Sequence, residues 1–117
     1  MPLDRSARFY LLRGHSVAAP LPASSPSRQG WVAVFNLQPI DSMVVAVLEA
    51  AQLTLARVRA FEVEVEHLDR GWEVAEEQLL EKREFTVHSF AELEDVVASL
   101  GVDPAELRLS ADTDCPI

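Results

Sequence analysis

The chain has 117 residues, 49% of them hydrophobic and 25% charged, which suits one domain with a buried core and argues against disorder. The formal net charge is −9, and residues 1–30 carry four arginines against one aspartate (+3), which leaves −12 for residues 31–117. This acidic body disfavours binding to nucleic acid or to an anionic membrane, and it suits a basic protein partner.

The sequence also bears on the compartment. Cys115 is the single cysteine, so no internal disulfide can form. The first residues lack the basic and then apolar pattern of a secretory signal, and no apolar run approaches the ~20 residues of a membrane helix. These features predict a cytoplasmic protein.

The N-terminal 30 residues divide into two segments. Residues 1–14 contain the run 8–13, which we expect to form an extra short strand that ends at Gly14. Residues 15–30 mix Pro20, Pro22 and Pro26 with serines, a composition that favours neither helix nor strand. We expect a flexible loop or linker, which either clasps a ligand or tethers the first strand.

Residues 31–117 are predicted to form a single α+β domain. Residues 31–37 are apolar on both faces, which is typical of a strand in the middle of a sheet. Asp41 is the expected N-cap of a helix over residues 42–56. Its apolar stripe is wide, so this helix either is well buried or contacts a partner as well as the sheet.

The strongest pattern lies between residues 57 and 74, where apolar residues and His67 alternate with glutamates over 61–67. Gly71 can adopt the positive φ of a tight turn, and Trp72 and Val74 resume the alternation. The pattern predicts a β-hairpin over 57–74 whose inner face includes His67 beside Trp72. Its outer face would carry five acidic side chains: Glu62, Glu64, Glu66, Glu73 and Glu77.

Some of the remaining segments, from residue 75 on, allow more than one conformation. Residues 75–84 have helix-forming composition, but a long bulged strand through 85–88 is favoured, with the bulge or break between Leu80 and Phe85. Ser89 and Glu92 form a capping box for a helix that ends near Leu100. Residues 103–106 start either another helical turn or the lead-in to a last strand at 107–109, before a polar tail from 111 to 117.

This order of elements from residue 31 predicts a ferredoxin-like split β-α-β fold with the order βαββα, or βαββαβ if the last strand forms. The expected N-terminal strand would be an addition to that fold. In that architecture the first and third strands are central and the second lies at the edge. Residues 31–37 are apolar on both sides, so a second cover is needed. Either the 8–13 segment or a second subunit would provide it.

The sequence contains no recognised catalytic or phosphate-binding motif, and His15, His67, His88 and Cys115 lack the spacing of metal ligands. We therefore predict no cofactor, no metal site and no catalytic residue, and an enzyme is the less favoured reading. The five glutamates are the candidate site for a basic partner, although charge on an edge strand also prevents aggregation. Two alternatives are a ferredoxin-like dimer with a small-molecule or catalytic pocket between sheet and helices, and a domain that only assembles with itself.

Overall fold

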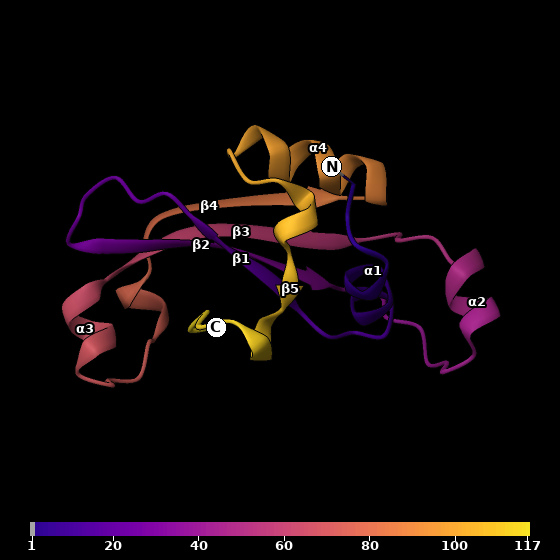
Figure 1. The fold of residues 1–117 in the computed structure, drawn as a ribbon, viewed down its shortest axis with the longest axis horizontal. Helices are drawn as coiled ribbons and strands as arrows, with labels where there is room; N and C mark the ends of the chain where they lie inside the picture. The colour runs from indigo at the N-terminus through magenta and orange to yellow at the C-terminus, as the bar shows by residue number, and fades with distance from the viewer. Residues whose placement is uncertain (1) are drawn as a thin grey trace.

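A computed structural model describes residues 2–117, which form an α+β fold built on a five-stranded antiparallel sheet (Figure 1). The strands are β1 (Val17–Leu21), β2 (Arg28–Asn36), β3 (Ala56–Glu64), β4 (Leu80–Val87) and β5 (Arg108–Leu109). The helices within these residues are α1 (Arg5–Leu12), α2 (Val45–Ala50), α3 (Val65–Asp69) and α4 (Phe90–Ser99). Three short 3₁₀ turns are η1 (Glu76–Gln78), η2 (Pro104–Glu106) and η3 (Ser110–Asp112).

The strand order is β4-β3-β2-β1-β5, and every neighbouring pair is antiparallel. The predicted ferredoxin-like order is therefore wrong, because β3 lies inside the sheet and β4 lies at its edge. The α+β class and the central position of β2 are confirmed. The error arises because β2 and β3 pair directly, as sequential antiparallel neighbours usually do, and α2 does not act as a crossover helix.

The predicted loop over residues 15–30 contains strand β1 and the start of β2. Pro20 is tolerated because β1 pairs with β5 only at Val17 and Ala18, so Pro20 lies on a free edge where its missing N–H costs no ladder bond. The two strands approach closely where Leu21 faces Gly30. A Cβ on Gly30 would lie 2.4 Å from the Leu21 carbonyl oxygen, so only glycine fits there.

The predicted N-terminal strand is a helix. Asp4 caps α1 by accepting a hydrogen bond from the Ser6 backbone N–H at 3.1 Å. Ala7 and Leu11 are four residues apart, so they fall on one helical face, and both are buried against the sheet. The run 8–13 lacks alternation, and the cap upstream of it decides its conformation.

Helix α2 is much shorter than the predicted helix over 42–56. It begins after Val44 rather than Asp41, and Leu48 is its one buried residue. Its two β-branched valines lower its intrinsic helicity, and residues 51–55 form no regular element before β3 begins. Figure 1 places α2 at the far end of the long axis from α3, in a molecule of 44 × 26 × 20 Å.

The predicted hairpin over 57–74 is not formed. Strand β3 ends at Glu64, and the chain then turns into α3 instead of continuing as a strand. Val65 and Leu68 are three residues apart, so the same short run of residues also fits one helical turn. Gly71 does adopt a positive φ of 69°, but it ends α3 rather than joining two paired strands.

The favoured long bulged strand is formed only in part, because residues 76–78 are the 3₁₀ turn η1 and β4 begins at Leu80; from there the elements follow the sequence pattern. The β3–β4 register shifts between Ala60 and Glu62, and Glu81 has a φ of +50°, which confirms the predicted bulge. The Ser89 hydroxyl accepts a hydrogen bond from the Glu92 N–H at 3.1 Å, and Gly101 follows the helix end with a φ of +93°. Residues 104–109 contain both options that were left open, a helical turn and a short strand.

The sheet separates two hydrophobic clusters. The larger one joins α1 and α4 to one face, where Leu11, Val32, Val58 and Leu93 are fully buried. The smaller one lies on the other face around Trp31 and Phe61, and Leu68, Val74, Cys115 and Ile117 pack against it. In Figure 1 α4 lies above the sheet, and α3 and the chain end lie below it. The predicted second cover is therefore made of the β3–β4 connection and the tail, and the 8–13 segment covers the opposite face.

Candidate binding site: a hollow between α3 and β4

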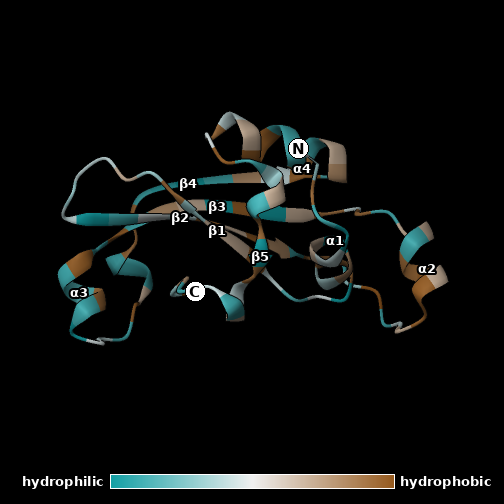
Figure 2. Cartoon of the chain, viewed as in Figure 1, coloured by the Kyte–Doolittle hydropathy of each residue, from teal (hydrophilic) through white to brown (hydrophobic). Residues whose placement is uncertain are grey.

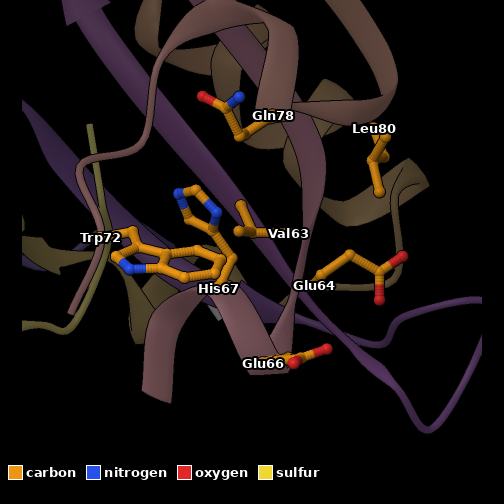
Figure 3. A pocket seen from close by; sticks show the side chains of 7 residues that line it. All are labelled: Val63, Glu64, Glu66, His67, Trp72, Gln78 and Leu80. Atoms are coloured by element: carbon orange, nitrogen blue, oxygen red, sulfur yellow. The ribbon is translucent and has the colours of Figure 1, made fainter. Parts of the chain in front are cut away.

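The connection from β3 to β4 encloses a hollow of about 400 Å³ at one end of the sheet. Helix α3 begins where β3 ends, and Gly71 then reverses the chain, so that α3, η1 and the start of β4 face a common space. Figure 3 shows the side chains around it: Val63, Glu64, Glu66, His67, Trp72, Gln78 and Leu80.

One wall of the hollow is aromatic. The His67 and Trp72 rings meet edge to face, with 5.4 Å between their centroids (Figure 3). His67 Nε2 donates to the Glu73 carbonyl oxygen at 2.8 Å, which fixes the ring against the backbone of the turn. Trp72 keeps 54% of its surface exposed. A large indole held in place yet open to solvent offers a ligand a ready contact surface.

The other wall is acidic. Glu64 ends β3 and Glu66 lies in the first turn of α3, and Figure 3 shows their carboxylates on the side of Val63 away from the two rings. Both side chains are exposed. Val63 and Leu80 supply apolar surface between the walls, and Gln78 supplies an amide.

Two arginines of the same chain accompany the acids. Arg28 lies 3.2 Å from Glu64, 3.6 Å from Glu62 and 3.8 Å from Glu81. Arg70 bonds Glu66 at 2.9 Å, and its guanidinium carbon lies 5.0 Å from the centroid of the Trp72 ring. Four carboxylates against two guanidinium groups leave this group with a net charge of −2.

Glu62 has a different role from the acids of the hollow, because it is buried. Its carboxylate accepts hydrogen bonds from the Ser24 hydroxyl at 2.8 Å and the Ser24 backbone N–H at 3.1 Å. Burial by itself disfavours the charged form, but the Ser24 bonds and the Arg28 guanidinium outweigh it, so the pKa of Glu62 lies below its ordinary value. Glu62 thereby fixes the β1–β2 loop to the sheet.

The five predicted glutamates therefore do not share one sheet face. The structure brings Glu64 and Glu66 together at the hollow and places Glu62 under the β1–β2 loop. Glu73 and Glu77 are exposed elsewhere on the connection, and neither makes an ion pair with residues 2–117. Whether any of the five binds a partner remains a prediction.

Sequence reasoning did pair His67 with Trp72, but in the core rather than on a hollow. It did not include Gln78 or Leu80, which reach the site only because the connection folds back. One signal was available: Trp72 stands among Asp69, Arg70 and Glu73, and an indole in so polar a stretch favours an exposed contact over a core position.

The residues at the hollow provide recognition more readily than reaction chemistry. No three His, Cys, Asp or Glu side chains converge as metal ligands anywhere in residues 2–117. The Cys115 thiol packs against the smaller cluster, where burial raises its pKa. The hollow combines carboxylates with an accessible aromatic surface, and this pairing binds organic cations.

Comparisons of the chain with protein-family models, curated proteins and solved structures gave no match. Across residues 2–117, every helix is too short or too polar to cross a membrane.

Proposed function

We propose that this chain is a protein-binding domain that receives a basic side chain, arginine or lysine, of a partner protein in the hollow between α3 and β4. The observation that carries the proposal is the juxtaposition of an exposed, fixed indole with two carboxylates across one small space. A cation there would contact the Trp72 ring and donate a charge-assisted hydrogen bond to Glu64 or Glu66.

Arg70 supports this choice of ligand. Its guanidinium already contacts Trp72 and pairs with Glu66, so the site engages a cation of its own chain by the chemistry proposed for a partner. The Arg70 side chain is 56% exposed, and an exposed pair one helical turn apart contributes only about 0.3–0.5 kcal/mol. A partner cation could therefore displace Arg70 at small cost.

The wider charge distribution favours a basic partner as well. Residues 31–117 carry −12, and such a field accelerates encounters with a positively charged surface. The attraction should weaken as salt is added, because most of these carboxylates are solvent-exposed.

The test uses a capped peptide of alternating glycine and arginine as probe and the same peptide with citrulline, which is neutral and nearly isosteric, as its control. Binding is followed by the indole N–H signals in two-dimensional NMR, because the protein has two tryptophans. We expect the Trp72 signal to shift with the arginine peptide while buried Trp31 serves as an internal reference. Equal shifts with the citrulline peptide, or an affinity independent of salt, would contradict the proposal.

Matched variants locate the site. Glu66→Gln should weaken arginine-peptide binding about threefold, the scale of one exposed charge contact, and Trp72→Leu should weaken it more. Arg70→Ser should strengthen binding, because it removes the competing guanidinium. Glu92→Gln in α4 is the control, since it removes the same charge on the opposite side of the sheet. If Glu92→Gln had the same effect as Glu66→Gln, only the overall charge would matter.

A further inference from the structure

A second surface lies at the opposite end of the molecule. Six large apolar side chains are exposed within residues 2–117, and five of them come from one segment of eleven residues. We call them the α2 patch: Leu37 (43% exposed), Met43 (71%), Val44 (57%), Val45 (51%) and Val47 (46%). Figure 2 shows α2 coloured as hydrophobic over most of its length, at the end of the molecule opposite α3.

The α2 patch stands on an anchored scaffold. Leu48 is buried in the larger cluster, and Glu49 pairs with Arg5 of α1. Backbone hydrogen bonds from the Leu37 N–H to the Leu55 carbonyl at 3.0 Å and from the Ile40 N–H to the Leu12 carbonyl at 2.7 Å fix the start of the segment to the residues before β3 and to the end of α1. A six-residue helix is not stable by itself, so these contacts are what keep the valines facing solvent.

The charge around the patch differs from that of the rest of the chain. Residues 2–14 and 37–55, which form α1, α2 and their flanks, contain three arginines and three acids: Arg5, Arg8, Arg13, Asp4, Asp41 and Glu49. Their net charge is zero, so the whole −9 of the protein lies elsewhere. The one charged residue of α2, Glu49, is already neutralised by Arg5.

This neutrality favours a second copy of the chain as the occupant. Two copies of a chain that carries −9 repel each other over most of their surface, and a second copy can approach at lowest electrostatic cost through this end. A head-to-tail arrangement would instead place the neutral patch against a differently charged surface such as the acidic hollow, where the charges do not match. A self-complementary contact around a two-fold axis places the neutral patch against itself.

We propose that the α2 patch is the interface of a symmetric homodimer in which α2 of one copy packs against α2 of the other. The contact would bury apolar surface that a monomer leaves in water, and a group of exposed apolar side chains in one short segment commonly marks an interaction site. This proposal is independent of the cation site, because it uses the opposite end of the molecule.

Sedimentation of the full chain over a dilution series tests the dimer. We expect the wild type to dimerise and Val45→Glu to raise the dissociation constant at least about tenfold. Both copies contribute the substituted residue to a two-fold interface, so two glutamates would repel each other there. A glutamate in the first turn of α2 suits the helix dipole, so the fold should survive, and circular dichroism checks this. Trp72→Glu is the matched control, since it replaces the sixth exposed large apolar residue, and its dimer should be as tight as the wild type.

Cross-linking gives a second readout. In a Cys115→Ser background, Val47→Cys should form a disulfide-linked dimer on mild oxidation, whereas Trp72→Cys should not. A wild type that stays monomeric at every concentration would overturn the proposal, as would a dimer unaffected by Val45→Glu. Preferential cross-linking through position 72 would place the contact at the other end and would also overturn it.

Discussion

The two faces of the sheet are covered in different ways. One face is covered by α1 and α4, and its cluster holds twenty of the buried residues within 2–117. The other face holds six and is covered by the β3–β4 connection and the tail. The two helices also contact each other: Arg8 lies 4.4 Å over the Phe90 ring, and the Leu3 N–H donates to Glu94 at 2.6 Å. No comparable links tie the tail to the β3–β4 connection.

The difference also appears in how polar groups are satisfied. The ends of α1 and α4 are capped by Asp4 and Ser89. Under the irregular cover, in contrast, Trp31 Nε1 is buried without an acceptor, and it is the one such side-chain atom in the described part of the chain. A regular element satisfies its own backbone and can be capped, whereas an irregular cover must find each partner separately. We therefore expect the helix-covered face to contribute more to stability.

The largest effect should come from Leu93→Ala. Leu93 is fully buried between α4 and the sheet, and its removal leaves a cavity that the flanking strands cannot close. We expect the free energy of unfolding to fall by about 2–5 kcal/mol. Urea denaturation followed by far-UV circular dichroism measures it, and a loss below that range would mean that the helix-covered face is not the main core.

Leu79→Ala removes the same atoms from the smaller cluster. Leu79 is 4% exposed, but it lies in the irregular connection, which can settle into the space that is vacated. The expected loss is about 2 kcal/mol, at the low end for this substitution. If Leu79→Ala cost as much as Leu93→Ala in the same urea experiment, the two faces would be equally tightly packed and the comparison would fail.

Glu62→Ala tests the bond that joins the β1–β2 loop to the sheet. It removes the charged acceptor of both Ser24 hydrogen bonds and should cost about 1.5 kcal/mol at neutral pH. The folded pKa of Glu62 is lowered, so its contribution is complete above the ordinary glutamate pKa and is lost as the pH falls through the lowered value. Denaturation at several pH values should therefore show wild type and variant converging in acid, and a constant gap would contradict this role.

Ser89→Ala should have the smallest effect of the four. It removes the acceptor for the Glu92 N–H at the start of α4, and such caps contribute about 1 kcal/mol. Ser89→Asp is the matched variant, because aspartate caps helices equally well and should retain the stability. A loss in both variants would show that the hydroxyl is needed for something other than the cap.

The longest alternating pattern, over residues 61–67, was not the best predictor, because the strand ends at Glu64. The double-sided apolar run of β2, the bulge in β4 and the capped helix α4 were all confirmed. Each has a local signal that one conformation alone satisfies. The class of fold, α+β, followed from these elements.

The strand order and the site were not predictable in the same way. Residues 65–68 fit a strand and one helical turn equally well, and tertiary packing of Leu68 against the smaller cluster favours the turn. Because the hairpin is not formed, Glu62 and Glu66 belong to different elements and there is no shared acidic face. The hollow depends on how a connection folds back over the sheet, and no periodic pattern encodes that path.

The single thiol belongs to the less regular of the two covers, where Cys115 is half-buried against the smaller cluster. Because burial raises the pKa of the Cys115 thiol, little thiolate exists there at neutral pH, and a thiol-specific reagent should react faster whenever the tail detaches from the sheet. The labelling rate of the native protein should then report how often residues 113–117 detach while the rest remains folded. Cys115 is thus a built-in probe of local unfolding on one of the two faces of the sheet.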